Sequence, residues 1–286
     1  MSRLERALRA RRYRLESSFR LLTSSLRMLP RTLLIGAQKA GTTSLFEYIV
    51  QHPAVGRPRR KEVRFFHKHY GRGMKWYHSQ FPIPIPGVTE TIDASPGYLD
   101  HPHVPARTAH HLPDARFIVL LRDPVERAWS HYRHSLRLGA ETLSFTEALS
   151  AEDERIEPLL ERMEKEPTYY PEQWAQFTYR RKGRYAEHLE RWFSHFDRRR
   201  FLILTSHEFR TSPEATMERV WRHLELPPHR ASEYPRYNEG QAVQVSDPAT
   251  GAAMTKLRNY FEPHDQRLEE LLGRSLEWRE ARGSPG

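Results

Sequence analysis

Residues 33–44 read Leu33-Leu34-Ile35-Gly36-Ala37-Gln38-Lys39-Ala40-Gly41-Thr42-Thr43-Ser44, and they carry the strongest local signal in this chain. The apolar run that ends at Gly36 predicts a buried strand, and the apolar residues after Thr42 predict that a helix begins there. A strand, a glycine-bracketed loop and a helix start together direct backbone N–H groups at a phosphate. We therefore predict a phosphate-binding loop in this segment.

The loop differs from the usual nucleoside-triphosphate loop, G-x-x-x-x-G-K-[ST], in the position of its lysine. Gly36 and Gly41 keep the spacing, but Thr42 follows the second glycine and the lysine, Lys39, stands three residues earlier. A P-loop kinase or NTPase remains one interpretation, although it lacks the lysine for the β- and γ-phosphates and a strand ending in a lone acidic Mg²⁺ ligand. An ordinary strand–turn–helix corner without a ligand is another.

Length and composition restrict the class of protein. The 286 residues suffice for one large core, so we expect one α/β domain with insertions. The absence of cysteine excludes disulfides and thiolate sites. No apolar run reaches the roughly 18–20 residues of a membrane span, and no signal-peptide core is visible. We expect a soluble, cytoplasmic protein.

The net charge of +10 is concentrated at the N-terminus. Residues 1–31 hold nine arginines against two glutamates, so this arm carries +7 and the rest of the chain is nearly balanced. Its leucines and Phe19 recur at helical spacing, which predicts a basic amphipathic helix. Three interpretations of this arm remain: a helix that docks on the body or on a second subunit, a peripheral contact with a membrane or an anionic polymer, or a disordered segment. A non-enzymatic module whose basic arm binds nucleic acid or a membrane is the alternative function, although we do not expect a nucleic-acid partner.

The remaining chain, residues 32–280, alternates strand and helix patterns. This predicts an α/β, three-layer, P-loop-like fold with a central parallel sheet flanked by helices. The expected strands are Thr32–Gly36, Gly87–Asp93, Phe117–Leu121 and Phe201–Thr205. The expected helices are Thr42–Gln51, Val125–Leu138, Glu147–Lys165, Arg184–Phe196, Pro213–Leu224 and Met254–Leu272. An aromatic segment, Tyr169–Tyr179, is either an acceptor-binding wall or core packing.

A second motif follows the third expected strand. Asp123 suits the N-cap of the next helix, Pro124 its first position, and Glu126 the third position of a capping box. Arg122 then stands at the C-terminal end of the strand, where open α/β sheets bind ligands. Ser130 lies two turns into the helix. An arginine and a hydroxyl suit a phosphate monoester, although Arg122 could equally pair with a structural carboxylate.

Together the two motifs resemble those of the 3′-phosphoadenylyl-sulfate (PAPS)-dependent sulfotransferases. The phosphosulfate loop of that family has the form of residues 38–44, and its 3′-phosphate element has the form Arg122-Asp123-Pro124 followed by Ser130. The chain looks most like the heparan-sulfate-type sulfotransferase domain and its bacterial relatives. Three further stretches support that branch: Lys61-Glu62-Val63-Arg64-Phe65-Phe66, Asp93-Ala94-Ser95-Pro96-Gly97-Tyr98, and the segment from Lys256 to Trp278.

The resemblance implies a site for PAPS, with adenosine 3′,5′-bisphosphate (PAP) as product and no metal. Lys39 would act at the bridging oxygen of the donor, where negative charge develops as the sulfuryl group leaves. The 5′-phosphate would be held by the loop residues Lys39, Ala40, Gly41, Thr42, Thr43 and Ser44, and the 3′-phosphate by Arg122 and Ser130. Arg236 is a further candidate cation at that end.

Glu62 matches the glutamate that serves as the base in the heparan-type branch. A structural ion pair of Glu62 with Lys61 or Arg64 is one alternative, and His67 or His69 as the base is another. Ala94 stands where that branch has a lysine, which weakens the case for a polyanionic acceptor. We expect a carbohydrate or small-metabolite acceptor with a hydroxyl or amine group; the pattern predicts neither its identity nor the oligomeric state.

Overall fold

A parallel sheet forms the centre of the protein in a computed structural model, which describes residues 3–230 and 248–283. Within these residues the strand order is β2-β3-β1-β4-β5. The strands are β1 (Thr32–Gly36), β2 (Val55–Gly56), β3 (Glu90–Ala94), β4 (Arg116–Leu121) and β5 (Phe201–Thr205). The predicted bounds of β1 and β5 are confirmed, β4 begins one residue early, and β3 begins later and ends one residue later. The two-residue β2 was not predicted because it is too short to show a pattern.

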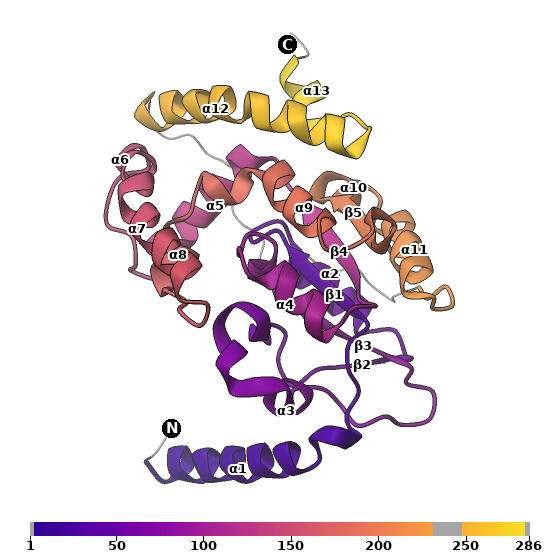
Figure 1. Ribbon diagram of the computed structural model, residues 1–286. Helices are drawn as coiled ribbons and strands as arrows, with labels where there is room; N and C mark the ends of the chain where they lie inside the picture. Colours follow the sequence, from indigo (N-terminus) through magenta and orange to yellow (C-terminus); the bar gives the residue numbers. More distant parts are fainter. Residues whose placement is uncertain (1–2, 231–247, 284–286) are drawn as a thin grey trace.

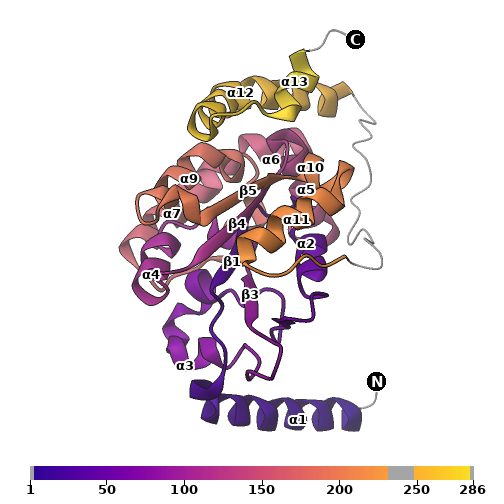
Figure 2. The ribbon, with the colours of Figure 1, turned by 90° about the vertical axis from the view of Figure 1, so that its right-hand side faces the viewer.

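Helices cover both faces of this sheet, which confirms the predicted three-layer α/β fold (Figure 2). The helices are α1 (Arg3–Leu22), α2 (Thr42–Ile49), α3 (Gly73–His78), α4 (Val104–His111), α5 (Pro124–Arg137), α6 (Phe145–Ser150), α7 (Glu152–Lys165), α8 (Glu172–Phe177), α9 (Tyr185–Phe193), α10 (Ser206–Thr211), α11 (Pro213–Leu224), α12 (Pro248–Leu272) and α13 (Glu277–Gly283). Among the described residues, no helix combines the length and the apolar character that a membrane crossing requires.

The prediction of one continuous helix over Glu147–Lys165 is wrong. The structure has two helices there, α6 and α7, which are separated at Ala151. Ser144 caps α6 through a capping box with Glu147. Glu152 at the start of α7 is fully buried, and its carboxylate accepts hydrogen bonds from the backbone N–H groups of Arg180 (2.7 Å) and Arg181 (3.0 Å). This contact ties the start of α7 to a distant turn, which a local pattern cannot reveal.

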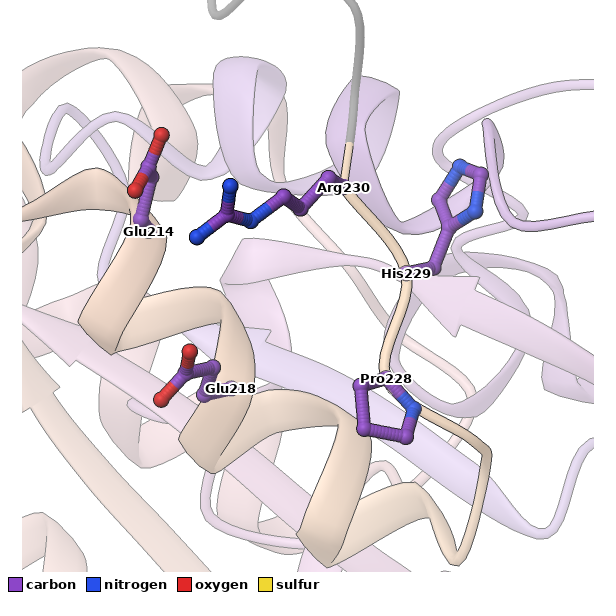
Figure 3. A pocket seen from close by; sticks show the side chains of 5 residues that line it. All are labelled: Glu214, Glu218, Pro228, His229 and Arg230. Carbon is purple, nitrogen blue, oxygen red and sulfur yellow. The ribbon is translucent and has the colours of Figure 1, made fainter.

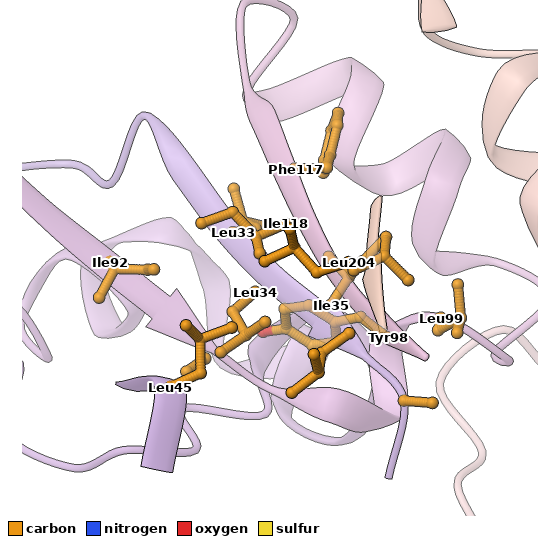
Figure 4. Close-up of a cluster of buried hydrophobic side chains, with 14 of the residues drawn as sticks. Leu33, Leu34, Ile35, Leu45, Ile92, Tyr98, Leu99, Phe117, Ile118 and Leu204 are labelled. Carbon is orange, nitrogen blue, oxygen red and sulfur yellow. The ribbon is translucent and has the colours of Figure 1, made fainter. Parts of the chain in front are cut away.

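The core lies on both sides of β1 and β4 (Figure 4). Every residue of β1 is buried, as are Phe117–Leu121 of β4, and this explains their unbroken apolar runs. The strands run parallel, with Leu34 beside Ala94 of β3 and Ile118 of β4. The loops that follow β1, β3 and β4 therefore leave the sheet at the same edge, and this edge positions the candidate site.

The arm forms the predicted helix, α1, which lies along the outside of the molecule beside α3 (Figure 1). Its C-terminal part is attached through arginines: Arg20 Nε donates to Ser79 O (2.6 Å), and Arg27 Nη1 donates to Phe81 O (2.9 Å). The apolar side chains Leu15, Phe19 and Leu22 are 65%, 58% and 84% exposed. The arm is thus docked by its cations, while this apolar face remains in solvent.

Two aromatic residues of the segment Tyr169–Tyr179 belong to the core. Trp174 and Tyr179 are buried, and they donate hydrogen bonds to Asp100 Oδ2 (2.7 Å) and Glu141 Oε2 (2.8 Å) respectively. Side chains in these positions cannot form a wall of an acceptor site, so for them the core-packing interpretation holds. Tyr170 packs its ring against His67 and His101.

Candidate active site

The loop between β1 and α2 has the geometry of a phosphate cradle. Gly41 is the N-cap of α2 with φ +103°, a left-handed conformation that glycine adopts without strain. Lys39 also has a positive φ, +71°. Leu45 N donates to Gly41 O, so α2 begins directly after the loop, and Thr42, Thr43 and Ser44 lie in its first turn. The amides and the positive end of the helix dipole favour a bound anion.

Lys39 lies in a strongly electropositive environment. Burial, and after it the charges of Arg137, Arg122 and Arg127, lower the pKa of Lys39 to about 8, although the field of Glu62 acts in the opposite direction. Three arginine charges therefore act on Lys39, beside the opposing charge of Glu62. Such an arrangement suits a ligand that carries more than one negative charge.

The structure joins the two sequence motifs. Arg122, at the end of β4, donates from Nη1 to the carbonyl oxygen of Lys39 (3.3 Å) and from Nε and Nη2 to Glu126 Oε2 (3.1 and 2.9 Å). Asp123 caps α5 as predicted, accepting from Val125 N (2.8 Å). Glu126 does not complete a capping box, because its carboxylate is engaged by Arg122. Ser130 stands in α5, as the sequence indicates.

A hollow beside Arg122 extends the site toward the C-terminal helices. Its lining includes Arg122, Glu126, Arg210, Arg258, Trp278 and Arg282. Arg282 is already paired with Asp123 (2.7 Å) and Asp265 (3.0 Å). The sequence did not identify Arg210 and Arg258 as site residues, because only the folded arrangement of α10 and α12 brings them to this hollow. Arg236, the predicted cation for this end, lies outside the described residues.

Glu62 lies before a π-helical turn, Phe65–His69, and its carboxylate is one-third exposed. It accepts from Arg64 Nε (2.8 Å) and lies 3.6 Å from Lys61 Nζ. The expected ion pairs are therefore present, but they do not bury the carboxylate. The charge of Glu62 acts on the ammonium group of Lys39, so the two charged groups lie near each other.

The rival histidine bases are held neutral. His67 is buried against Tyr98 and Tyr170, and this burial places its pKa well below the ordinary value. Burial and then Arg72 lower the pKa of His69 to about 4. His67 is too enclosed to meet an acceptor, and neither ring takes up a second proton at neutral pH.

A buried hydrogen-bond network supports the segment that carries Glu62. Asp93, at the end of β3, accepts from Ser95 Oγ (2.7 Å) and Tyr98 OH (2.7 Å). The two hydroxyl groups in turn accept from the backbone N–H groups of Arg64 (2.9 Å) and Phe65 (2.9 Å). The motif around Asp93 therefore fixes the backbone just after Glu62.

Another pocket lies elsewhere, beside α11, lined by Glu214, Glu218, Pro228, His229 and Arg230 (Figure 3). None of the predicted site residues belongs to it. Among the residues that the structure describes, no group of three or more His, Asp or Glu side chains could hold a metal ion.

The chain is similar in sequence to known sulfotransferases. The family model described as "Sulfotransferase domain" matches residues 29–248. The human bifunctional heparan sulfate N-deacetylase/N-sulfotransferase 3 is 34% identical over 280 residues, which cover 85% of this chain and 30% of that protein. The human heparan sulfate glucosamine 3-O-sulfotransferase 5 is 27% identical, covering 87% of this chain and 74% of the relative. This chain thus spans only about 30% of the length of the first relative.

The crystal structure of a sulfotransferase from Alicyclobacillus acidocaldarius superposes with a TM-score of 0.71 at 29% sequence identity. The match covers 88% of this chain and 99% of that structure.

Proposed function

The chain belongs to the sulfotransferase domain family, and from this premise we propose that it transfers a sulfuryl group from PAPS to a hydroxyl or amine of a carbohydrate. The observation that carries the proposal is the junction of the two motifs: Arg122 donates a hydrogen bond to the backbone of Lys39, whose ammonium group lies in the field of three arginines. The carbohydrate class is supported by the names of the relatives, which refer to heparan sulfate and glucosamine.

The donor is proposed to lie along the loop edge of the sheet. Lys39, Ala40, Gly41, Thr42, Thr43 and Ser44 would hold the 5′-phosphate through their amides and hydroxyl groups. Arg122 and Ser130 would hold the 3′-phosphate. Arg210 and Arg258 supply further positive charge in the adjoining hollow, whether or not Arg236 also contributes.

The reaction is an in-line displacement at sulfur. The acceptor oxygen or nitrogen forms a bond to sulfur while the bond from sulfur to the bridging oxygen breaks, and its electron pair stays on the 5′-phosphate of PAP. Glu62 takes the proton of the acceptor, and Lys39 stabilises or protonates the bridging oxygen. Each charge that develops is met by a side chain of this protein, so these steps call for no metal.

Donor binding provides the test of this function, because it needs no acceptor. We expect PAP without metal to raise the melting temperature by about 5–10 °C at a hundredfold excess over its Kd. ATP with Mg²⁺ is expected to have no effect, since the loop has no lysine after Gly41 to hold the β- and γ-phosphates. Differential scanning fluorimetry measures both. Stabilisation by ATP–Mg²⁺ alone would instead support the kinase or NTPase alternative.

We further propose that the arm, residues 1–31, contacts an anionic membrane surface, and that residues 32–280 form the sulfotransferase domain. The exposed Leu15, Phe19 and Leu22 form the apolar face, and the net charge of +7 complements anionic lipid. The cytoplasmic location stays a prediction.

The triple variant Leu15→Ser/Phe19→Ser/Leu22→Ser tests the arm. We expect the wild type to float with vesicles of phosphatidylglycerol but not of phosphatidylcholine, and the variant to lose about tenfold or more of this binding, because three apolar side chains are removed from the interface. Both proteins should bind PAP equally. If the wild type ignores anionic vesicles and the variant only converts a dimer to a monomer, the apolar face contacts a second subunit.

A further inference from the structure

Lys182 is a buried cation that the proposed reaction does not yet use. It belongs to the short turn Arg181–Gly183 between α8 and α9, and its side chain is 4% exposed. Its ammonium group donates to Gln38 Oε1 (2.7 Å) and lies 3.8 Å from Asp100 Oδ2. Gln38 directly precedes Lys39, so a residue 144 positions away reaches into the phosphate-binding loop.

The surrounding fold brings Lys182 close to the loop. A Cβ atom at the neighbouring Gly183 would lie 2.7 Å from the ring of Phe261 and 2.9 Å from Pro124, so only glycine allows the turn to pack this tightly. Burial lowers the pKa of Lys182, and Asp100 counteracts this shift. Keeping a lysine here costs desolvation free energy, which the contacts with Asp100 and Gln38 offset in part.

The chemistry of lysine determines how the Gln38 amide is oriented. An ammonium group has three donors and no acceptor, so the amide group of Gln38 must turn its oxygen toward Lys182. Its NH₂ group is then directed away from Lys182 and remains a donor. Without Lys182 the amide could rotate by half a turn and present its oxygen, which would repel an anion.

We propose that Lys182 is a positioning residue that orients Gln38 so that its NH₂ group donates a hydrogen bond to the sulfuryl group of PAPS. This inference rests on the proposed function. Gln38 lies before Lys39, away from the helix-start amides that would hold the 5′-phosphate. Lys182 is also near enough to the proposed base for the charge of Glu62 to act on its ammonium group.

The competing explanation is that Lys182 only neutralises Asp100, which is buried and accepts a hydrogen bond from Trp174 Nε1 (2.7 Å). Removing the lysine alone would leave a buried carboxylate without its cation and could prevent folding. The double variant Lys182→Met/Asp100→Asn removes both charges, while the amide oxygen introduced at position 100 still accepts from Trp174. It therefore separates the positioning role from charge neutralisation.

The test compares two ligands that differ by the sulfuryl group, PAPS and PAP, in calorimetric titrations without acceptor. We expect Lys182→Met/Asp100→Asn to bind PAPS about tenfold or more weakly, as for the loss of a hydrogen bond to a charged group. PAP should keep its wild-type affinity. Gln38→Met should show the same selective loss, and combining the substitutions should add nothing further.

A matched control is Arg155→Met/Glu141→Gln, which removes another ion pair with a buried carboxylate (2.8 Å) that makes no contact with the loop. We expect its ratio of PAPS to PAP affinity to stay at the wild-type value. Equal losses for both ligands in the Lys182 variant, or an unchanged ratio in Gln38→Met, would overturn the positioning role. A wild-type protein that binds neither ligand would instead overturn the proposed function.

Discussion

Lys39→Ala is expected to lower kcat for sulfuryl transfer by about 10³-fold, because it removes the cation at the oxygen where charge develops. The fold should persist. Lys39 is held among Arg137, Arg122 and Arg127, so its removal relieves repulsion and the melting temperature should not fall. Transfer of labelled sulfate from PAPS to glucosamine-containing oligosaccharides measures the rate. Lys165→Ala, at an exposed position on α7, is the matched control and should retain full activity.

The pH profile gives a second readout of the same lysine. Since the pKa of Lys39 is lowered to about 8, its charged form is lost as the pH rises through this value. We expect kcat/KM of the wild type, which reports the free enzyme, to decline above about pH 8. The decline in kcat should occur at higher pH, because bound phosphates favour the ammonium form. The Lys39→Arg variant should not show this alkaline decline, because the arginine side chain keeps its proton at these pH values. Full activity of Lys39→Ala would refute the assignment.

The parts of the structure that the sequence predicted well are those that depend on neighbours along the chain. β1 and β5 are runs of apolar residues with clear ends, and the bounds of α11 were also predicted correctly. The phosphate-binding loop follows from two glycines and the residues between them. Asp123 could be assigned as an N-cap because the cap accepts from amides only two and three residues away.

The parts that could not be predicted depend on contacts between distant segments. Glu126 fits a capping box locally, but Arg122 competes for its carboxylate once β4 ends beside the loop. Lys182 reaches Gln38 only because the fold packs its turn against α5 and α12. The arm shows the same limit: its apolar spacing predicts which residues share a face, but not that Arg20 and Arg27 would make the contacts with the body.

Glu62→Gln is expected to lower kcat by about 10²- to 10⁴-fold, the usual contribution of a positioned base. Glutamine has nearly the same shape and can still accept from Arg64, but it cannot take the proton of the acceptor. PAP affinity and the melting temperature should therefore change little. Glu62 also raises the pKa of Lys39, so the alkaline decline in the residual activity should move to lower pH.

The matched control is His69→Gln, because His69 belongs to the same segment and, unlike His67, is not fully buried. We expect this variant to transfer sulfate at the wild-type rate. A full-rate Glu62→Gln enzyme together with an inactive His69→Gln enzyme would reverse the assignment. Loss of PAP binding in Glu62→Gln would show that the carboxylate mainly organises Arg64 and Lys61, whereas loss of kcat alone is what proton abstraction by Glu62 requires.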